Sequence, residues 1–203
     1  MGEFLELKSA DNNNFSAYVS QPLEKPIAGL VILQEIFGVN THIKEVTDLY
    51  ANRGYLTIAP ALFDRIESNI ELEYDEEGVN KGRKLKELCD KDALKDIDAA
   101  ISVVSSAGNV GIIGYCWGGS LSWRIACQSN NLSASVCYYG GDIPRLKTLE
   151  PKCSVLTHFG ELDQGIPIDS VEVFKSIKPK VLTYTYPADH GFNCDHRKQY
   201  NEV

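Results

Sequence analysis

The sequence lacks the features that mark several large classes of protein. It has no excess of basic residues, because 20 Lys and Arg stand against 28 Asp and Glu, giving a formal net charge of −8. No basic stripe stands out, and an acidic chain repels phosphate backbones, so we expect no nucleic-acid partner. The longest apolar runs, such as 29–33 and 110–114, are about a quarter of the ~20 residues that a membrane-spanning helix needs, so we expect no membrane insertion.

The N-terminus and the cysteines favour the cytoplasm. Residues 1–6 carry two glutamates where a signal peptide would have positive charge followed by a long apolar core. The six cysteines include no Cys-x-x-Cys pair, which removes the usual zinc and thioredoxin-like signatures. We therefore predict no metal and no cofactor, and we expect free thiols that serve mainly as small buried hydrophobes.

What is present fits one folded domain spanning residues 1–203. The chain is 43% hydrophobic and 24% charged, which is enough for a substantial core, and its 203 residues compare with roughly 150 per domain. No repeat, low-complexity tract or linker divides it. The composition leaves open whether the protein is a monomer or a dimer.

Apolar runs alternate with amphipathic segments, which predicts an α/β fold with a mostly parallel central sheet and helices on both faces. Two N-terminal strands are expected near 4–8 and 15–19, joined by a turn at 11–14. The later strands lack polar alternation and are therefore expected to be covered on both faces; they are 29–33, 55–59, 110–114, 135–139, 154–159 and 181–186.

Residues with a period near 3.6 predict helices between these strands. Residues 65–77 are polar and without period, so we expect a long surface loop that leads into a helix near 82–88. The faces expected to pack on the sheet are Ile43, Val46, Leu49 and Tyr50; Leu94, Ile97, Ile101 and Val104; and, after Pro167, Ile168, Val171, Phe174 and Ile177.

The most informative segment is 110–120, where a buried strand runs into Gly114-Tyr115-Cys116-Trp117-Gly118 and then into helical spacing. This is the nucleophile-elbow pattern with sulfur in place of the serine oxygen. The glycines leave room for a very tight turn, and the N-terminus of the following helix favours a thiolate. The Trp117 amide is then placed to bind an oxyanion.

A nucleophile on this turn needs an acid and then a histidine, in that chain order. Asp163 follows the expected strand 154–159, and His190 follows the strand 181–186 in a loop before a glycine. Glu161 competes with Asp163, which lies farther past its strand and is preferred. The other histidines are interpreted as surface or packing residues: His42, His158 and His196.

Four motifs together resemble the dienelactone hydrolase (carboxymethylenebutenolidase) family over almost the whole chain. They are Gln34-Glu35-Ile36-Phe37-Gly38, residues 114–119, Gly160-Glu161-Leu162-Asp163 and Asp189-His190-Gly191-Phe192. The resemblance implies an α/β-hydrolase fold and hydrolysis of a small ester or lactone through Cys116, His190 and Asp163. It also implies that Glu35 assists formation of the thiolate and that the Ile36 amide is the second oxyanion donor. Residue patterns alone leave Glu35 equally open to a capping or ion-pairing role.

The chain departs from the family pattern at two places. The resemblance implies two arginines for an anionic substrate, but Cys194 stands at the position four residues beyond His190; the candidates are Arg65, Arg83 and Arg197. The resemblance also implies a long C-terminal helix, and residues 196–201 look like its beginning, so we expect the domain to lack most of that helix and to expose an apolar patch.

Two other classes of function stay open at this point. The chain could be a ligand-binding protein that keeps a hydrolase fold without catalysis, or a redox-responsive protein in which Cys116 forms a sulfenic acid. The set of Cys116, Asp163 and His190 favours the enzyme over both.

Overall fold

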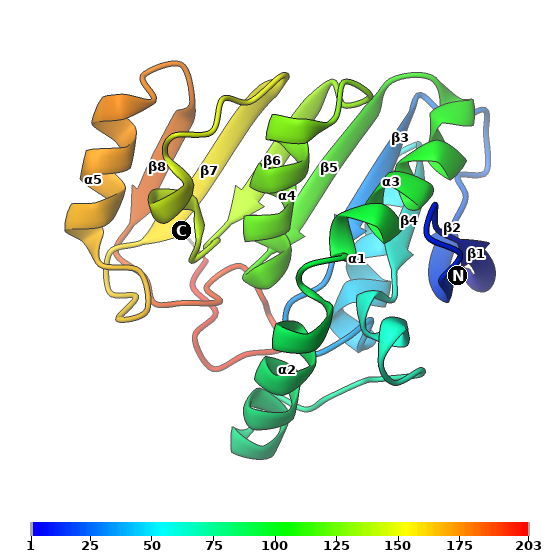
Figure 1. Ribbon diagram of the computed structural model, residues 1–203, viewed down its shortest axis with the longest axis horizontal. Coiled ribbons are helices and arrows are strands. Elements are labelled where there is room, and N and C mark those ends of the chain that lie inside the picture. Colours follow the sequence, from blue (N-terminus) through cyan, green and yellow to red (C-terminus); the bar gives the residue numbers. More distant parts are fainter. Residues whose placement is uncertain (1, 203) are drawn as a thin grey trace.

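The computed structural model describes residues 2–202 and contains an eight-stranded sheet in the order β1-β2-β4-β3-β5-β6-β7-β8 (Figure 1). The first two strands pair antiparallel with each other and with β4, and every later neighbouring pair is parallel. The strands are β1 (Glu3–Lys8), β2 (Asn14–Ser20), β3 (Ala28–Leu33), β4 (Tyr55–Pro60), β5 (Val110–Tyr115), β6 (Ala134–Tyr138), β7 (Ser154–Gly160) and β8 (Leu182–Tyr186).

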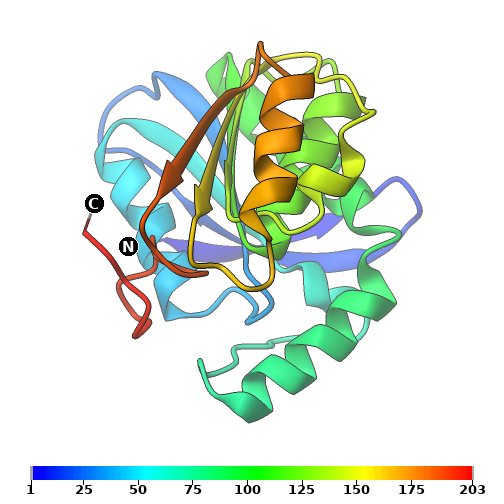
Figure 2. The same cartoon turned by 90° about the vertical axis from the view of Figure 1, so that its left-hand side faces the viewer.

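Helices lie on both faces of this sheet, as the alternation of the sequence predicts (Figure 2). One face carries α1, and the other carries α3, α4 and α5. The α-helices are α1 (Thr41–Asn52), α2 (Glu76–Cys89), α3 (Ala93–Val104), α4 (Trp117–Gln128) and α5 (Ile168–Ile177), with short 3₁₀ turns η1 (Leu62–Arg65), η2 (Ser105–Ala107) and η3 (Ile143–Leu146). The predicted α/β architecture is confirmed.

The central strands bury nearly all of their side chains, whereas the last strand does not. β3 has five buried residues in a row, as expected for a strand covered on both sides. In β8, Leu182 is 60% exposed and Tyr184 is 50% exposed, so the expectation of two covered faces is wrong there. These side chains are exposed because β8 is the edge strand of the sheet.

Two helices pack on the core with most of the face expected from the sequence, and each exposes one residue of it. In α1, Ile43 and Ala51 are buried while Leu49 is 46% exposed. In α5, Val171 and Phe174 are buried while Ile177, in the last turn, is 48% exposed. Residues 196–201 form turns and irregular structure, so the helix expected to begin there is not seen.

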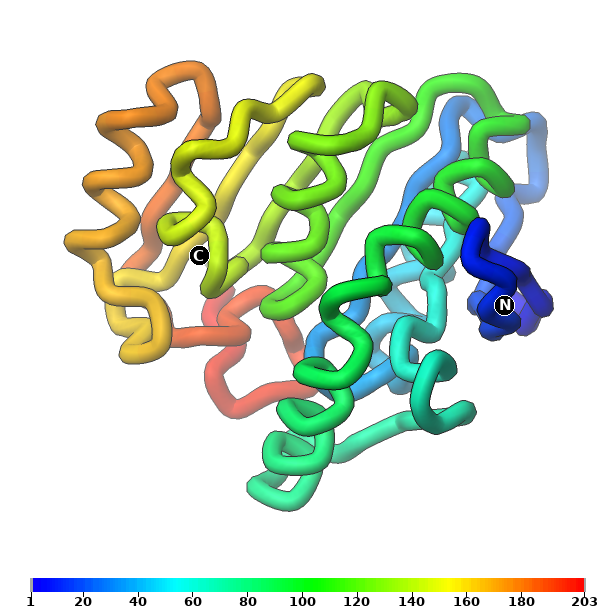
Figure 3. The backbone as a smooth tube through the Cα atoms, viewed as in Figure 1, coloured from blue at the N-terminus to red at the C-terminus, as the bar shows by residue number. Residues whose placement is uncertain are grey.

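The carboxyl ends of the parallel strands meet at one edge of the sheet, which is where open α/β sheets bind ligands. The segments after β3, β5, β7 and β8 lie there, and the last of these, drawn in red in Figure 3, runs across this edge. Within residues 2–202, no helix is both long enough and apolar enough to cross a membrane.

Candidate active site

Cys116 occupies a strained turn between β5 and α4. Its φ of 54° and ψ of −113° lie outside the usual region for an L-residue, and such strain tends to collect at functional sites. Gly114 allows this turn, because a Cβ there would lie 2.0 Å from the Gly118 carbonyl oxygen. Since Cys116 is only partly buried, its thiol stands at the accessible end of the sheet.

The backbone around the thiol is held by two neighbouring strands. The Cys116 amide donates to the Tyr138 carbonyl at 3.0 Å, and the Gly118 amide donates to the Gln34 carbonyl at 3.1 Å. The second bond ties the segment after β3, including Ile36, to the start of α4. Among residues 2–202, the Ile36 and Trp117 amides have no hydrogen-bond acceptor, so both donors are available to a ligand.

Asp163 and His190 meet although they follow different strands. The His190 Nδ1 lies 2.6 Å from the Asp163 Oδ2. Asp163 is buried, and its other oxygen accepts the Gly165 amide at 2.8 Å, which fixes the carboxylate. Because Nδ1 faces the carboxylate, Nε2 is the ring nitrogen left for a proton exchange with another group.

The protonated form of His190 is favoured by its neighbours. Burial lowers the pKa of the imidazole, but the charge of Cys116, together with hydrogen bonds to Asp163 and Cys116, outweighs it and raises the pKa to about 10. An imidazolium beside a thiolate is the arrangement that activates a cysteine nucleophile.

Glu161 and His158, the alternatives to Asp163 and His190, make other contacts. Glu161 is exposed and accepts a hydrogen bond from the Thr185 hydroxyl at 3.0 Å. His158 stacks on Tyr138, and its Nδ1 lies 2.7 Å from the Tyr186 hydroxyl. Burial lowers the pKa of His158 to about 4, so it is a neutral packing residue at pH 7.

Glu35 is buried after β3 and is paired with Arg197. The Arg197 Nη1 donates to the Glu35 Oε1 at 2.9 Å, while the buried Oε2 has no hydrogen-bond partner among the described residues. The guanidinium also lies over two rings, with its carbon 5.7 Å from the centroid of Phe37 and 5.5 Å from that of Tyr74. Among residues 2–202, Arg197 is therefore the one ion-pair partner of this buried carboxyl group.

Gly191 leaves the space that the Arg197 side chain occupies. A Cβ at this position would lie 2.6 Å from the Arg197 guanidinium carbon, and the φ of Gly191 is +83°. The chain after His190 therefore turns so that Arg197 folds back over it. Cys194, the residue at the expected arginine position, is buried and donates its thiol hydrogen to the Tyr74 hydroxyl.

The three candidate arginines have different surroundings. Arg65 contacts the buried Asp96 at 2.6 Å and Asp11 at 2.9 Å, so its charge is already paired. Arg83 is exposed on α2 and has no ion-pair partner among the described residues. Of the three, only Arg197 contacts another candidate site residue.

The sequence reasoning did not identify Asp90, at the end of α2, as part of this region. Its Oδ1 accepts the Trp117 indole N–H at 2.7 Å, and its Oδ2 accepts Arg124 at 2.8 Å. The indole also stacks on Phe63, with ring centroids 5.4 Å apart. No local pattern links these residues, because only folding brings α2 beside the start of α4.

Comparisons with known proteins identify the family of the chain. The family model described as "Dienelactone hydrolase family" matches residues 15–203. A "Putative carboxymethylenebutenolidase" of Synechocystis sp. is 33% identical over 214 residues, covering 94% of this chain and 86% of the relative. The "Carboxymethylenebutenolidase" of Pseudomonas putida is 33% identical over 202 residues, covering 94% and 85%.

A solved structure shows the same fold. The "Putative Dienelactone Hydrolase" of Klebsiella pneumoniae superposes with a TM-score of 0.83 at 28% identity, covering 100% of this chain and 92% of that one. The family predicted from the four motifs is confirmed by these matches. The chain belongs to the dienelactone hydrolase family and has an α/β-hydrolase fold.

Proposed function

We propose that this protein hydrolyses a small carboxylic ester or lactone, with Cys116 as nucleophile, His190 as general base and acid, and Asp163 as the group that orients the imidazole. The observation that carries the proposal is the contact between His190 and Asp163 at 2.6 Å, together with a cysteine on a strained strand-to-helix turn whose charge acts on His190. Membership of a hydrolase family supports the same class of reaction.

The first half of the reaction forms an acyl-enzyme. The Cys116 thiolate attacks the carbonyl carbon, and the electron pair of the carbonyl bond moves to oxygen, where the Ile36 and Trp117 amides donate to it. The tetrahedral intermediate collapses, the carbon–oxygen bond to the leaving group breaks, and the alkoxide takes a proton from the His190 Nε2. In a lactone, the alcohol stays tethered to the acyl group.

The second half releases the acid. His190 takes a proton from a water molecule, the hydroxide attacks the thioester carbonyl, and the carbon–sulfur bond breaks to restore the thiolate. Amines leave less readily than sulfur, so we expect esters and lactones to react and peptides not to. Glu35, buried near this centre, is proposed to assist formation of the thiolate, as the family resemblance implies.

Arg197 is our candidate for binding an anionic substrate. Its side chain is 14% exposed and is held against Glu35, Phe37 and Tyr74, so a substrate carboxylate would compete with Glu35 for the guanidinium. Arg83 is a second candidate. We do not assign this role to Arg65, because its pairing with Asp96 and Asp11 occupies the guanidinium. Rates for matched neutral and anionic lactones would test the charge preference.

The proposed nucleophile is tested by hydrolysis of p-nitrophenyl acetate and a panel of lactones. We expect Cys116→Ala to lower kcat/KM by at least about a thousandfold, and Asp163→Asn to lower it substantially, because removing a triad member removes most of the rate enhancement. Cys153→Ala, another partly buried cysteine, is the matched control and should retain the rate. Hydrolysis by Cys116→Ala at the rate of the unmodified protein would overturn the assignment.

The six cysteines also support the cytoplasm as the proposed place of action, since all are free thiols. A redox role for Cys116 predicts that peroxide, without substrate, yields a reversible sulfenic acid as the main functional event. A ligand-binding role predicts thermal stabilisation by lactones with no turnover. Turnover by the unmodified protein decides against both as the main function.

A further inference from the structure

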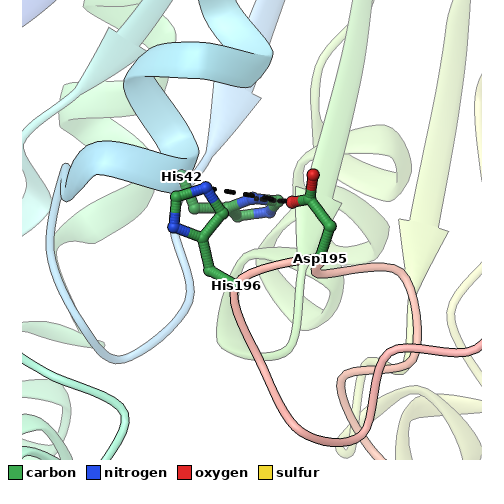
Figure 4. Close-up of side chains that lie close together, drawn as sticks. All are labelled: His42, Asp195 and His196. Atoms are coloured by element: carbon green, nitrogen blue, oxygen red, sulfur yellow. Dashed lines mark ion pairs between the residues drawn. The ribbon is translucent and has the colours of Figure 1, made fainter.

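A cluster of metal-ligating side chains lies beside the candidate active site and has no role in the proposed hydrolysis. Figure 4 shows His42 from the first turn of α1 facing Asp195 and His196 from the C-terminal segment. The His42 Nδ1 lies 3.3 Å from the Asp195 Oδ1, and the His196 Nε2 lies 4.0 Å from the same oxygen. One potential ligand atom from each of the three residues lies within 4.8 Å of the others.

A fourth potential ligand, Glu45, adjoins the cluster. Glu45 stands three residues after His42 on α1, so both side chains project from the same face of the helix. The Glu45 Oε2 lies 2.7 Å from the His196 Nε2. Glu45 contacts His196 but lies outside the three ligand atoms that are all within 4.8 Å of one another, so as a fourth ligand its exposed side chain turns toward the ion.

The spacing of these atoms suits a tetrahedral metal ion. Bonds of about 2.0–2.1 Å at tetrahedral angles separate neighbouring ligand atoms by roughly 3.4 Å. The distances of 3.3 and 4.0 Å from Asp195 are close to that value, and the 2.7 Å hydrogen bond between His196 and Glu45 would open when a cation replaces the proton between them. Imidazole together with carboxylate favours Zn²⁺ over Mg²⁺ or Ca²⁺, which prefer oxygen alone.

The buried histidine is suited to the role. His42 is 3% exposed, and its Nε2 is buried without a hydrogen-bond partner among the described residues. Its Nδ1 faces Asp195 at 3.3 Å and is the ring nitrogen that can bind a metal. The negative charge of Glu35 acts on this ring, and it would favour a proton on Nε2 once Nδ1 binds a cation.

We propose that His42, Glu45, Asp195 and His196 bind one Zn²⁺ ion that links α1 to the C-terminal segment. Binding forms two bonds from nitrogen and two from carboxylate oxygen, and water leaves the ion. His42 binds through Nδ1 with its proton on Nε2, and His196 binds through Nε2 with its proton on Nδ1.

The site would fix the segment that carries Arg197, which directly follows His196. Without a metal, the contacts of Asp195 with His42 and of Glu45 with His196 hold this part of the segment to α1, and contacts of such exposed carboxylates contribute little to stability. With Zn²⁺, the backbone at 195–197 is tied to a helix, and the contact between Arg197 and Glu35 becomes more rigid. Metal binding itself does not depend on the proposed hydrolysis.

The site is tested by titrating the chelator-treated protein with Co²⁺ and then displacing the Co²⁺ with Zn²⁺. We expect one equivalent to bind with the visible absorption of nitrogen and oxygen ligation and without the near-ultraviolet thiolate-to-cobalt band of cysteine ligation. His196→Gln and Glu45→Gln, both at exposed or half-exposed positions, should weaken binding by at least about tenfold. Glu172→Gln, an exposed glutamate on α5, is the matched control.

A second measurement keeps the result independent of variant stability. Zn²⁺ should slow hydrogen exchange of the amides at 195–197 in the unmodified protein and leave them unchanged in His196→Gln. No binding by the unmodified protein at micromolar metal, a thiolate band, or equal affinity in His196→Gln would overturn the proposal. These readouts do not involve ester hydrolysis, so failure of the metal site and failure of the proposed function are distinguishable.

Discussion

At the scale of single residues, the six thiols of the chain differ in how far burial suppresses their reactivity. Cys116 is partly exposed at the start of α4, so a reagent can reach its thiol. Burial raises the pKa of the other five thiols, including that of Cys153; the pKa rises to about 12 for Cys89 and Cys137 and to about 11 for Cys127 and Cys194. Because the thiolate is the reactive species, the six thiols should differ in their rates of reaction with an electrophile.

We therefore predict that iodoacetamide at neutral pH labels Cys116 before any other cysteine. Mass spectrometry of peptides after increasing times of reaction checks the order. Prior labelling of Cys127 or Cys153, the other partly exposed thiols, would contradict it.

At the scale of secondary-structure elements, a helix contact supports the candidate oxyanion hole. Asp90 ends α2 and accepts hydrogen bonds from Trp117 and Arg124 of α4. We predict that Asp90→Ala lowers the free energy of unfolding by about 1 kcal/mol, discounted for the partial exposure of this carboxylate. It should also lower kcat, because the Trp117 amide loses its orientation. Asp92→Ala, which removes only a surface ion pair to Lys95, should leave both quantities near their original values in denaturant melts and ester assays.

The strand β7 carries a histidine that makes the fold sensitive to acid. His158 is 9% exposed, and burial lowers its pKa to about 4, below the usual 6.5 of the unfolded chain. Above pH 6.5 both states are neutral at this site, and between pH 6.5 and 4 only the unfolded state takes up the proton. We predict that the unfolding free energy falls over this range by up to about 3 kcal/mol from this group alone.

The comparison with His158→Phe tests that prediction. Phenylalanine can keep the stacking on Tyr138 but does not titrate, so its unfolding free energy should vary less between pH 6.5 and 4. Equal slopes for the two proteins in urea unfolding would show that other groups cause the acid sensitivity.

At the scale of the whole molecule, an ion-pair network joins the antiparallel N-terminal hairpin to the parallel part of the fold. Arg65 of η1 contacts Asp11, in the β1–β2 turn, and the fully buried Asp96 of α3. We predict that Arg65→Ala destabilises the protein by about 3 kcal/mol, since it leaves Asp96 buried without its counter-ion. KM for an anionic lactone should stay unchanged. A raised KM with unchanged stability would instead support a substrate-binding role for Arg65.

The positions of the strands and the elbow could be predicted because their signals are local. A short apolar run predicts a buried strand. The tight turn at Cys116 requires small residues near it in the chain, such as Gly114. Asp163 and His190 could be chosen because each follows a strand, and parallel strands end at the same edge of the sheet. These inferences need only neighbours along the chain and the general rules of parallel sheets.

The partners of the charged side chains were decided only by tertiary structure. Arg197 reaches Glu35, Arg65 reaches Asp96, and His196 reaches Glu45 through loops whose paths depend on the packing of distant segments. Long polar side chains can meet many partners, and which one they meet is set by differences of a few ångströms that no periodicity encodes. The sequence by itself thus determined the fold, the family and the candidate catalytic set, while folding in three dimensions determined which arginine stands beside them and which histidines converge.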